Sequence, residues 1–321
     1  MKRKTLGLFA ALAVLAFGIS LFVGRYSISP AEILRPESMS FRVFFNLRLP
    51  RTAVALIAGA GLALGGYVFQ TLFSNPIASP DIIGVASGAG TGAACAILLF
   101  GSGALTTACG AMAGGFLAVV MALALVRRAG SQNTAAFLLA GIVVNSLAQS
   151  ALMAIKLAAD PESQLASIEY WLMGSLSAVT GNKALPVCIL ALLGIVPLVA
   201  MSKTVDLLSL PSDEAQLLGV NVGKMRGLVI LLATLAVTAV TSIAGLISFI
   251  GLLAPHGARL ILKNNSRATL VLSMLMGGIL VLGADCLARS LLTRELPISI
   301  LTSLIGAPYL VWLMVKRGGR V

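Results

Sequence analysis

The sequence predicts an all-α, polytopic membrane protein in which about ten helices cross the bilayer and both termini lie in the cytoplasm. Of its 321 residues 58% are hydrophobic and only 11% are charged, too few polar side chains for the outward faces of a soluble fold. Long apolar runs alternate with short charged loops along the whole chain. These runs are continuous, whereas a membrane β-barrel would alternate apolar and polar residues. We therefore expect a single transmembrane domain over residues 1–321.

The predicted spans follow one another with short connections. A basic start, Lys2 to Lys4, precedes a first apolar run that is long for the core of a signal peptide (roughly 7–15 residues), so an uncleaved helix is expected. The glycines and alanines of the later runs suit helices that pack closely in lipid. The nearly continuous stretch 227–262 must be divided around 242–245, and both halves then need cover from other helices. The predicted spans are 6–23, 52–73, 84–100, 105–126, 134–157, 184–201, 227–243, 246–262, 269–292 and 298–315.

The placement of lysine and arginine sets the orientation. With the N-terminus inside, the inner segments carry 14 of the 23 basic residues and the outer segments carry 9. The net charge of +12 is spread over the loops and forms no basic patch, so a nucleic-acid partner is not expected. The first outer loop, 24–51, and the segment before the last span are nevertheless unusually basic for the outer side. The orientation rule does not explain this excess, which therefore needs another reason.

The inner loop 202–226 carries a short polar run that predicts a helix on the inner membrane surface. Ser212 is positioned to cap it, and Asp213 and Glu214 would lie in its first turn, at the positive end of the helix dipole. Gly219 is placed to end it. A short amphipathic helix there is a natural docking element, and the alternative is an ordinary solvated loop.

No cofactor, metal or catalytic site is predicted, so the chain is not expected to be an enzyme. The run 219–224 (GVNVGK) has glycines spaced too closely for a nucleotide-binding loop, and Met225 stands where such a loop needs Ser or Thr. His256 is the only histidine, and a lone histidine is more often a structural hydrogen-bonding group than a base. The four cysteines lie within apolar runs without metal-ligand spacing, as small packing residues do.

Asp285 lies inside the ninth predicted span, where a carboxylate is costly. Arg289 follows four residues later on the same helix face, so we expect the two to form a structural ion pair. The alternative is a proton relay. A relay usually shows several intramembrane acids, and here the other candidate, Asp81, falls in a segment that resembles a loop.

Seven motifs in matching order over nearly the whole chain make it resemble the permease subunit of the ABC importers for iron siderophores, haem and vitamin B12 (FecCD-type permease). These motifs are RLPR at 48–51, GAGLALGG at 59–66, NPIASPDIIG at 75–84, YWLMGSL at 170–176, GLISFIGLLAPH at 245–256, ELPIS at 295–299 and GAP at 306–308.

The resemblance implies a ten-helix permease in the cell membrane that works with other chains. A second permease subunit, identical or paralogous, would complete the central pathway, separate ATP-binding cassette subunits would hydrolyse ATP, and an extracytoplasmic binding protein would deliver the cargo. By the same resemblance, the residues expected to dock the binding protein are Arg48, Arg51, Arg289 and, less directly matched, Arg294. ATPase coupling falls to the inner helix with Asp213, Glu214, Leu217, Leu218 and Gly219.

Ferric siderophores are the cargo that the resemblance favours, and haem or cobalamin is the alternative within the family. A different class, an ion-coupled secondary carrier, would show paired broken helices and several intramembrane acids. A membrane-embedded enzyme would need clustered His, Asp or Glu. Apart from membrane lipid, the partners expected are therefore the protein subunits of an ABC importer.

Overall fold

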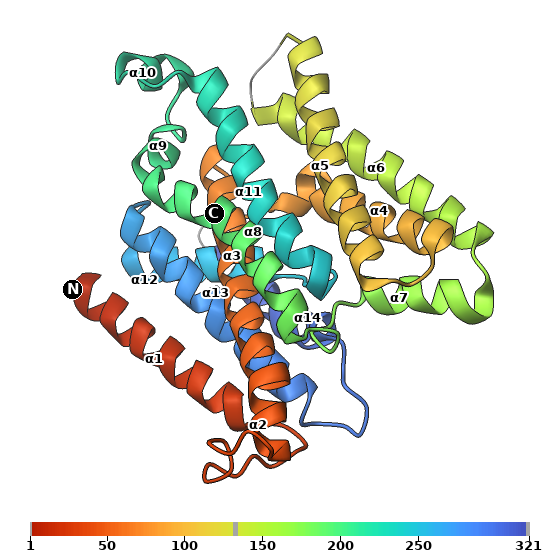
Figure 1. The fold of residues 1–321 in the computed structure, drawn as a ribbon. Coiled ribbons are helices and arrows are strands. Elements are labelled where there is room, and N and C mark those ends of the chain that lie inside the picture. Colours follow the sequence, from red (N-terminus) through yellow and green to blue (C-terminus); the bar gives the residue numbers. More distant parts are fainter. Residues whose placement is uncertain (1, 131–133, 319–321) are drawn as a thin grey trace.

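The structure, a computed structural model, describes residues 2–130 and 134–318, and all regular elements within these ranges are helical (Figure 1). Three short non-α turns, Phe44–Arg48, Pro80–Ile83 and Pro161–Leu165, interrupt or precede the longer helices. The α-helices are α1 Lys2–Phe22, α2 Met39–Val43, α3 Leu49–Leu72, α4 Val85–Phe100, α5 Ala104–Arg128, α6 Thr134–Ala158, α7 Ala166–Leu172, α8 Gly181–Ala200, α9 Ser202–Leu207, α10 Ser212–Leu217, α11 Val222–Ala244, α12 Ile250–Leu262, α13 Arg267–Ala288 and α14 Ile298–Gly318.

Each of the ten predicted spans corresponds to one helix, so the predicted fold class is confirmed. Among the residues that the structure describes, seven helices are long and apolar enough to cross a bilayer, and α4, α12 and the apolar part of α14 are shorter. The largest difference in length is in the seventh span, predicted as 227–243 and observed as α11 Val222–Ala244. The ninth span was predicted to reach residue 292, whereas α13 ends at Ala288 and the chain then runs irregularly to α14. The short helices α9 and α10 lie at the end of the bundle opposite to α2 and α7, as expected for inner and outer connections (Figure 1).

Helix α3 lies at the centre of the bundle. It is the most deeply buried of the seven long helices and packs against α13, α11, α12 and α8. Its contact with α13 is made backbone against backbone, since a Cβ at Gly59 would lie 2.2 Å from the carbonyl oxygen of Gly277, and a Cβ at Gly277 would lie 2.3 Å from that of Gly59. Membrane helices gain stability from such close van der Waals packing.

A methyl group at Gly59 is expected to destabilise the protein. Gly59→Ala should lower the free energy of unfolding by about 1–3 kcal/mol, because α3 and α13 must separate to admit it. Gly283→Ala is the matched control: this glycine lies in α13, the helix that Gly59 contacts, and an added Cβ there meets nothing within 4 Å. Thermal unfolding in detergent should show a lower midpoint for the first variant and an unchanged or higher one for the second. Equal midpoints would contradict this account of the α3–α13 contact.

The predicted division of the stretch 227–262 is confirmed. Helix α11 ends at Ala244, Gly245 adopts a positive φ of 68°, and α12 starts after Phe249, which also has a positive φ. Backbone groups near the break bond to other segments: the Ser175 amide donates to the Ala244 carbonyl at 2.7 Å, and the Ser299 hydroxyl donates to the Leu246 carbonyl. An irregular backbone at membrane depth needs this kind of cover from protein.

Candidate functional site

The outer end of the bundle holds a cluster of four charges, which we call the outer charge cluster: the buried Arg51, Asp285 and Arg289, and the partly buried Glu295. Asp285 has no exposed surface, and its Oδ1 accepts from Arg51 Nε at 2.9 Å and lies 2.8 Å from Nη2. Its other oxygen, Oδ2, lies 3.3 Å from Arg289 Nε. The pair of Asp285 with Arg289, expected from their spacing, is therefore present, and Arg51 joins it from α3.

Two further groups complete the outer charge cluster. Glu295 faces Arg51 from the segment before α14, with oxygens 3.1 Å from Nη1 and 3.0 Å from Nη2. Arg289 Nη2 donates to the carbonyl and hydroxyl oxygens of Ser20, at 2.7 and 2.6 Å, which ties α13 to α1. Two cations thus meet two carboxylates, and each charge in the cluster is compensated. Buried charges persist only when paired in this way.

The structure separates the four arginines predicted to receive a binding protein. Arg48, Arg51 and Arg289 are 8%, 9% and 3% exposed. Arg51 and Arg289 are held in the outer charge cluster, and the Arg48 guanidinium donates to the carbonyls of Val23 and Tyr26. These three guanidinium groups are therefore engaged mostly in contacts within the chain. Arg294 is the member of the predicted set that is exposed.

Other basic side chains are available at the outer surface. Arg25, Arg35 and Arg42 of the first outer loop are exposed, like Arg294. Arg25 Nη2 donates to the Leu292 carbonyl at 2.8 Å, so the first outer loop lies beside the segment that carries Arg294. The charge count had placed Arg25 outside, but no sequence signal brought it next to Arg294.

The inner helix α10 forms where the sequence predicts it, with one difference at its start. Pro211 is the N-cap residue, Ser212 is the first helical residue, and no side-chain bond caps the helix, so the predicted capping role of Ser212 is wrong. The fixed φ of proline suits Pro211 to the position just before the helix begins. At the other end Gly219 has a φ of +83° and donates to Gln216, while Val220 donates to Ala215, the Schellman pattern.

The surface of α10 is polar at its start and apolar at its end. Asp213 and Glu214 are exposed in the first turn, and Leu217 and Leu218 are 88% and 60% exposed at the end. Large exposed apolar side chains beside charges are typical of a protein-binding surface. All five residues predicted for ATPase coupling therefore lie together on one short element.

A polar cluster not predicted from the sequence holds α9 against the bundle. The Tyr67 hydroxyl of α3 donates to Asp206 Oδ1 of α9 at 2.9 Å. Burial raises the pKa of Asp206, and both this hydrogen bond and the charge of Arg259 oppose the shift. Arg259 of α12 stacks on the Tyr67 ring at 4.8 Å and donates to Thr71 at 2.9 Å. Helices α3, α9 and α12 are thereby joined next to the predicted coupling helix.

The remaining sequence candidates form no reaction centre in the part of the chain that the structure describes. His256 is buried and packs edge-to-face against Tyr309, with ring centroids 6.0 Å apart. Within residues 2–130 and 134–318 no three His, Cys, Asp or Glu side chains lie close enough together to hold a metal ion.

Comparison with known proteins identifies the family. The profile of the FecCD transport family matches residues 12–316. The chain belongs to the FecCD transport family. Its fold is shared with a solved ABC transporter described as of metal-chelate type and inward-facing, at 37% sequence identity and a TM-score of 0.89, covering 98% of this chain and 99% of that one.

Curated relatives of this FecCD permease transport several kinds of cargo. The molybdate import permease MolB of Haemophilus influenzae is 37% identical over 96% of this chain and 95% of its own length. The hemin transport permease HmuU of Yersinia pestis is 34% identical, covering 98% and 96%. Iron chelatin and vitamin B12 permeases are also among the relatives. The chain is thus a multi-pass inner-membrane permease of an ABC importer of the metal-chelate, haem and vitamin B12 type.

Proposed function

We propose that this FecCD permease forms half of the pathway of an ATP-driven importer for a ferric siderophore. Family membership over residues 12–316 carries the proposal, and relatives that transport iron chelatin and hemin support an iron complex as the cargo. Haem or cobalamin is the alternative within the family. Molybdate is a second candidate, because the molybdate permease MolB is 37% identical to this chain.

The assembly that we propose has a separate partner for each side of the membrane. A second permease subunit completes the pathway, ATPase subunits bind the inner helix α10, and an extracytoplasmic binding protein docks on the outer surface. The exposed leucines at the end of α10 support the inner contact, since a helix that docks in a groove gains from apolar anchors. The exposed arginines of the outer loops support the outer one.

Cargo can be assigned by transport into proteoliposomes that contain the assembled importer and its binding protein. Uptake driven by ATP should be highest for a ferric siderophore, while haem, cobalamin and molybdate should compete weakly. A preference for molybdate or haem would overturn the cargo assignment and leave the permease role intact. Loss of all uptake without the ATPase subunits would distinguish an ABC importer from an ion-coupled carrier.

Docking of the binding protein is expected to depend on the exposed arginines. The double variant Arg25→Glu, Arg294→Glu should weaken docking about fivefold or more, with the larger effect at low salt, because rim charges act mainly on the rate of encounter. Binding can be measured in nanodiscs at two ionic strengths. Arg128→Glu, an exposed arginine on the inner side, is the matched control and should bind normally.

Arg48 and Arg51 need a separate test because they are buried. If Arg48→Gln lowers docking in a protein of unchanged thermal stability while the double variant at Arg25 and Arg294 does not, the buried arginines receive the partner after a rearrangement of the outer surface. Unchanged affinity in all of these variants would contradict docking through arginines on this surface.

A further inference from the structure

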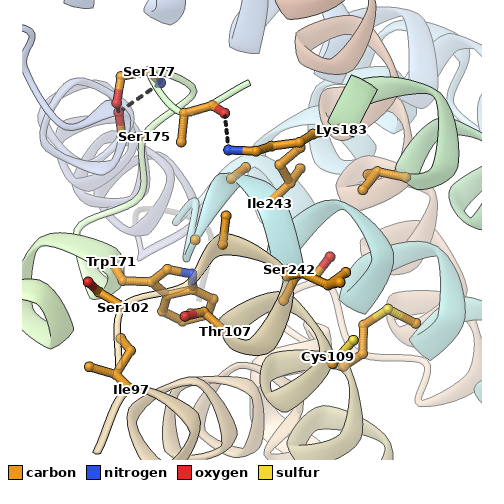
Figure 2. Close-up of a pocket in the computed structure, with 18 of the residues that line it drawn as sticks. Ile97, Ser102, Thr107, Cys109, Trp171, Ser175, Ser177, Lys183, Ser242 and Ile243 are labelled. Atoms are coloured by element: carbon orange, nitrogen blue, oxygen red, sulfur yellow. Dashed lines mark hydrogen bonds between the residues drawn. The ribbon is translucent and has the colours of Figure 1, made fainter. Parts of the chain in front are cut away.

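A cavity of about 460 Å³ lies between the outer ends of α5 and α8 (Figure 2). Helix α11 packs against both of these helices, whereas no substantial contact joins α5 directly to α8 in the described part of the chain. The outer end of α11, around Ser242 to Gly245, forms its floor, and Trp171 of α7 closes one side. We call this space the outer groove. Its volume falls within the range of ligand pockets, roughly 300–1,000 Å³.

The outer groove is apolar along its walls and polar at one end. Leu105 and Met112 of α5, Val187 and Leu190 of α8, and Ile243 of α11 line its walls. Lys183, Ser175 and Ser177 gather at one end, away from Cys109 (Figure 2). An elongated ligand that is apolar over most of its length and polar at its head matches this distribution.

Lys183 supplies the only charge among the described residues that line the outer groove. Its ammonium group donates to the Ala178 carbonyl at 3.4 Å and remains exposed. Lys156, another outer lysine, is already paired with Glu169 at 2.9 Å, and that acid does not line the groove. The head of the ligand should therefore carry negative charge.

The outer groove opens where lipid lies. Lys183 is in the first turn of α8, at the outer boundary of the membrane, and two apolar residues that follow it in α8, Leu185 and Ile189, are 66% and 50% exposed. Leu105, at the rim on α5, is 78% exposed. Apolar side chains this exposed on membrane-crossing helices face acyl chains.

We propose that the outer groove binds one anionic phospholipid from the outer leaflet. An acyl chain fills the apolar part between α5 and α8, and the phosphate lies beside Lys183 and the hydroxyls of Ser175 and Ser177. The contact is non-covalent and stabilises the junction of α5, α7, α8 and α11 through van der Waals contacts between the acyl chain and the apolar walls of the groove. This site is separate from the outer charge cluster and from α10, so it does not depend on the cargo or on the ATPase.

Trp171 offers a direct test, because the chain has only two tryptophans. In the full-length Trp312→Phe variant, the remaining Trp171 fluorescence reports lipid that enters the outer groove. The protein is reconstituted in phosphatidylcholine containing either brominated phosphatidylglycerol or brominated phosphatidylcholine at equal mole fraction. Brominated acyl chains quench only on contact. We expect the anionic lipid to associate about fivefold more strongly, the effect of one basic residue near a charged headgroup.

Three variants decide the result. Lys183→Gln should remove the preference for phosphatidylglycerol, and Lys183→Arg should keep it. Arg35→Gln, which removes an exposed outer charge away from the groove, is the matched control and should keep the preference. Equal quenching by both lipids, or a preference that survives Lys183→Gln, would overturn the proposal. Absence of quenching by either lipid would also overturn it and would point to a protein segment in the groove.

Discussion

Asp285→Asn is expected to lower the free energy of unfolding by about 3–5 kcal/mol, the cost of removing one partner from a buried ion pair. Asp285 is fully buried between Arg51 and Arg289. Without its charge, Arg51 keeps Glu295, but Arg289 keeps only neutral partners, Ser20 and Cys286. The variant should therefore express poorly or unfold at a lower temperature in detergent, while any importer that assembles should still transport.

Glu295→Gln is the matched control for this prediction. The Glu295 side chain is 28% exposed, and Arg51 would keep Asp285, so we expect a loss below about 1 kcal/mol. The comparison separates loss of charge in general from loss of the buried partner. If Asp285→Asn folds with wild-type stability and abolishes uptake, Asp285 acts in a proton relay and not as a structural anion.

Leu217→Asp is expected to detach the ATPase or to uncouple its activity from transport. Leu217 is 88% exposed at the end of α10, and apolar anchors of this kind contribute about 2 kcal/mol or more where they enter a partner's pocket. A carboxylate in that pocket would weaken the contact at least about thirtyfold. Co-purification of the ATPase and substrate-stimulated hydrolysis should both fall, with thermal stability unchanged.

Leu34→Asp provides a matched change on the opposite side of the membrane. Leu34 is 87% exposed in the first outer loop, so the same substitution there should leave ATPase binding intact. Leu218→Asp should reproduce the effect of Leu217→Asp. Normal co-purification and normal hydrolysis in both α10 variants would mean that the coupling contact lies elsewhere and that α10 is only part of a connection between α8 and α11.

The ten spans could be predicted from the sequence because a helix that crosses lipid needs an apolar run about as long as the bilayer is thick. The break between α11 and α12 was equally predictable, since residues 227–262 are too many for one membrane-crossing helix and must be divided near Gly245. Hydropathy does not say which way a loop folds, however. It gave no sign that the chain around Arg48 and Arg51 turns these side chains inward, and exposed arginines were expected instead.

The contacts that the sequence did not predict share one property: they join residues that are far apart along the chain. Glu295 meets Arg51 across 244 positions, and Tyr67 meets Asp206 across 139. No local period or spacing encodes such contacts. Asp285 and Arg289 were predictable because four residues along a helix place two side chains on the same face. Ser212 shows a different kind of error. Serine is a favourable capping residue, but the N-cap position is occupied by the preceding proline.

The reciprocal contact of Gly59 with Gly277 limits which substitutions this sequence can accept during evolution. When a large side chain grows in an ordinary core, its neighbour can shrink and restore the fit. Here each position already carries the smallest residue, and each would collide with the other's backbone. A substitution at either site therefore has no compensating change at its partner, and relief would require α3 and α13 to move apart together with everything packed on them. The two positions should stay glycine together across homologous permeases, whatever cargo those permeases carry.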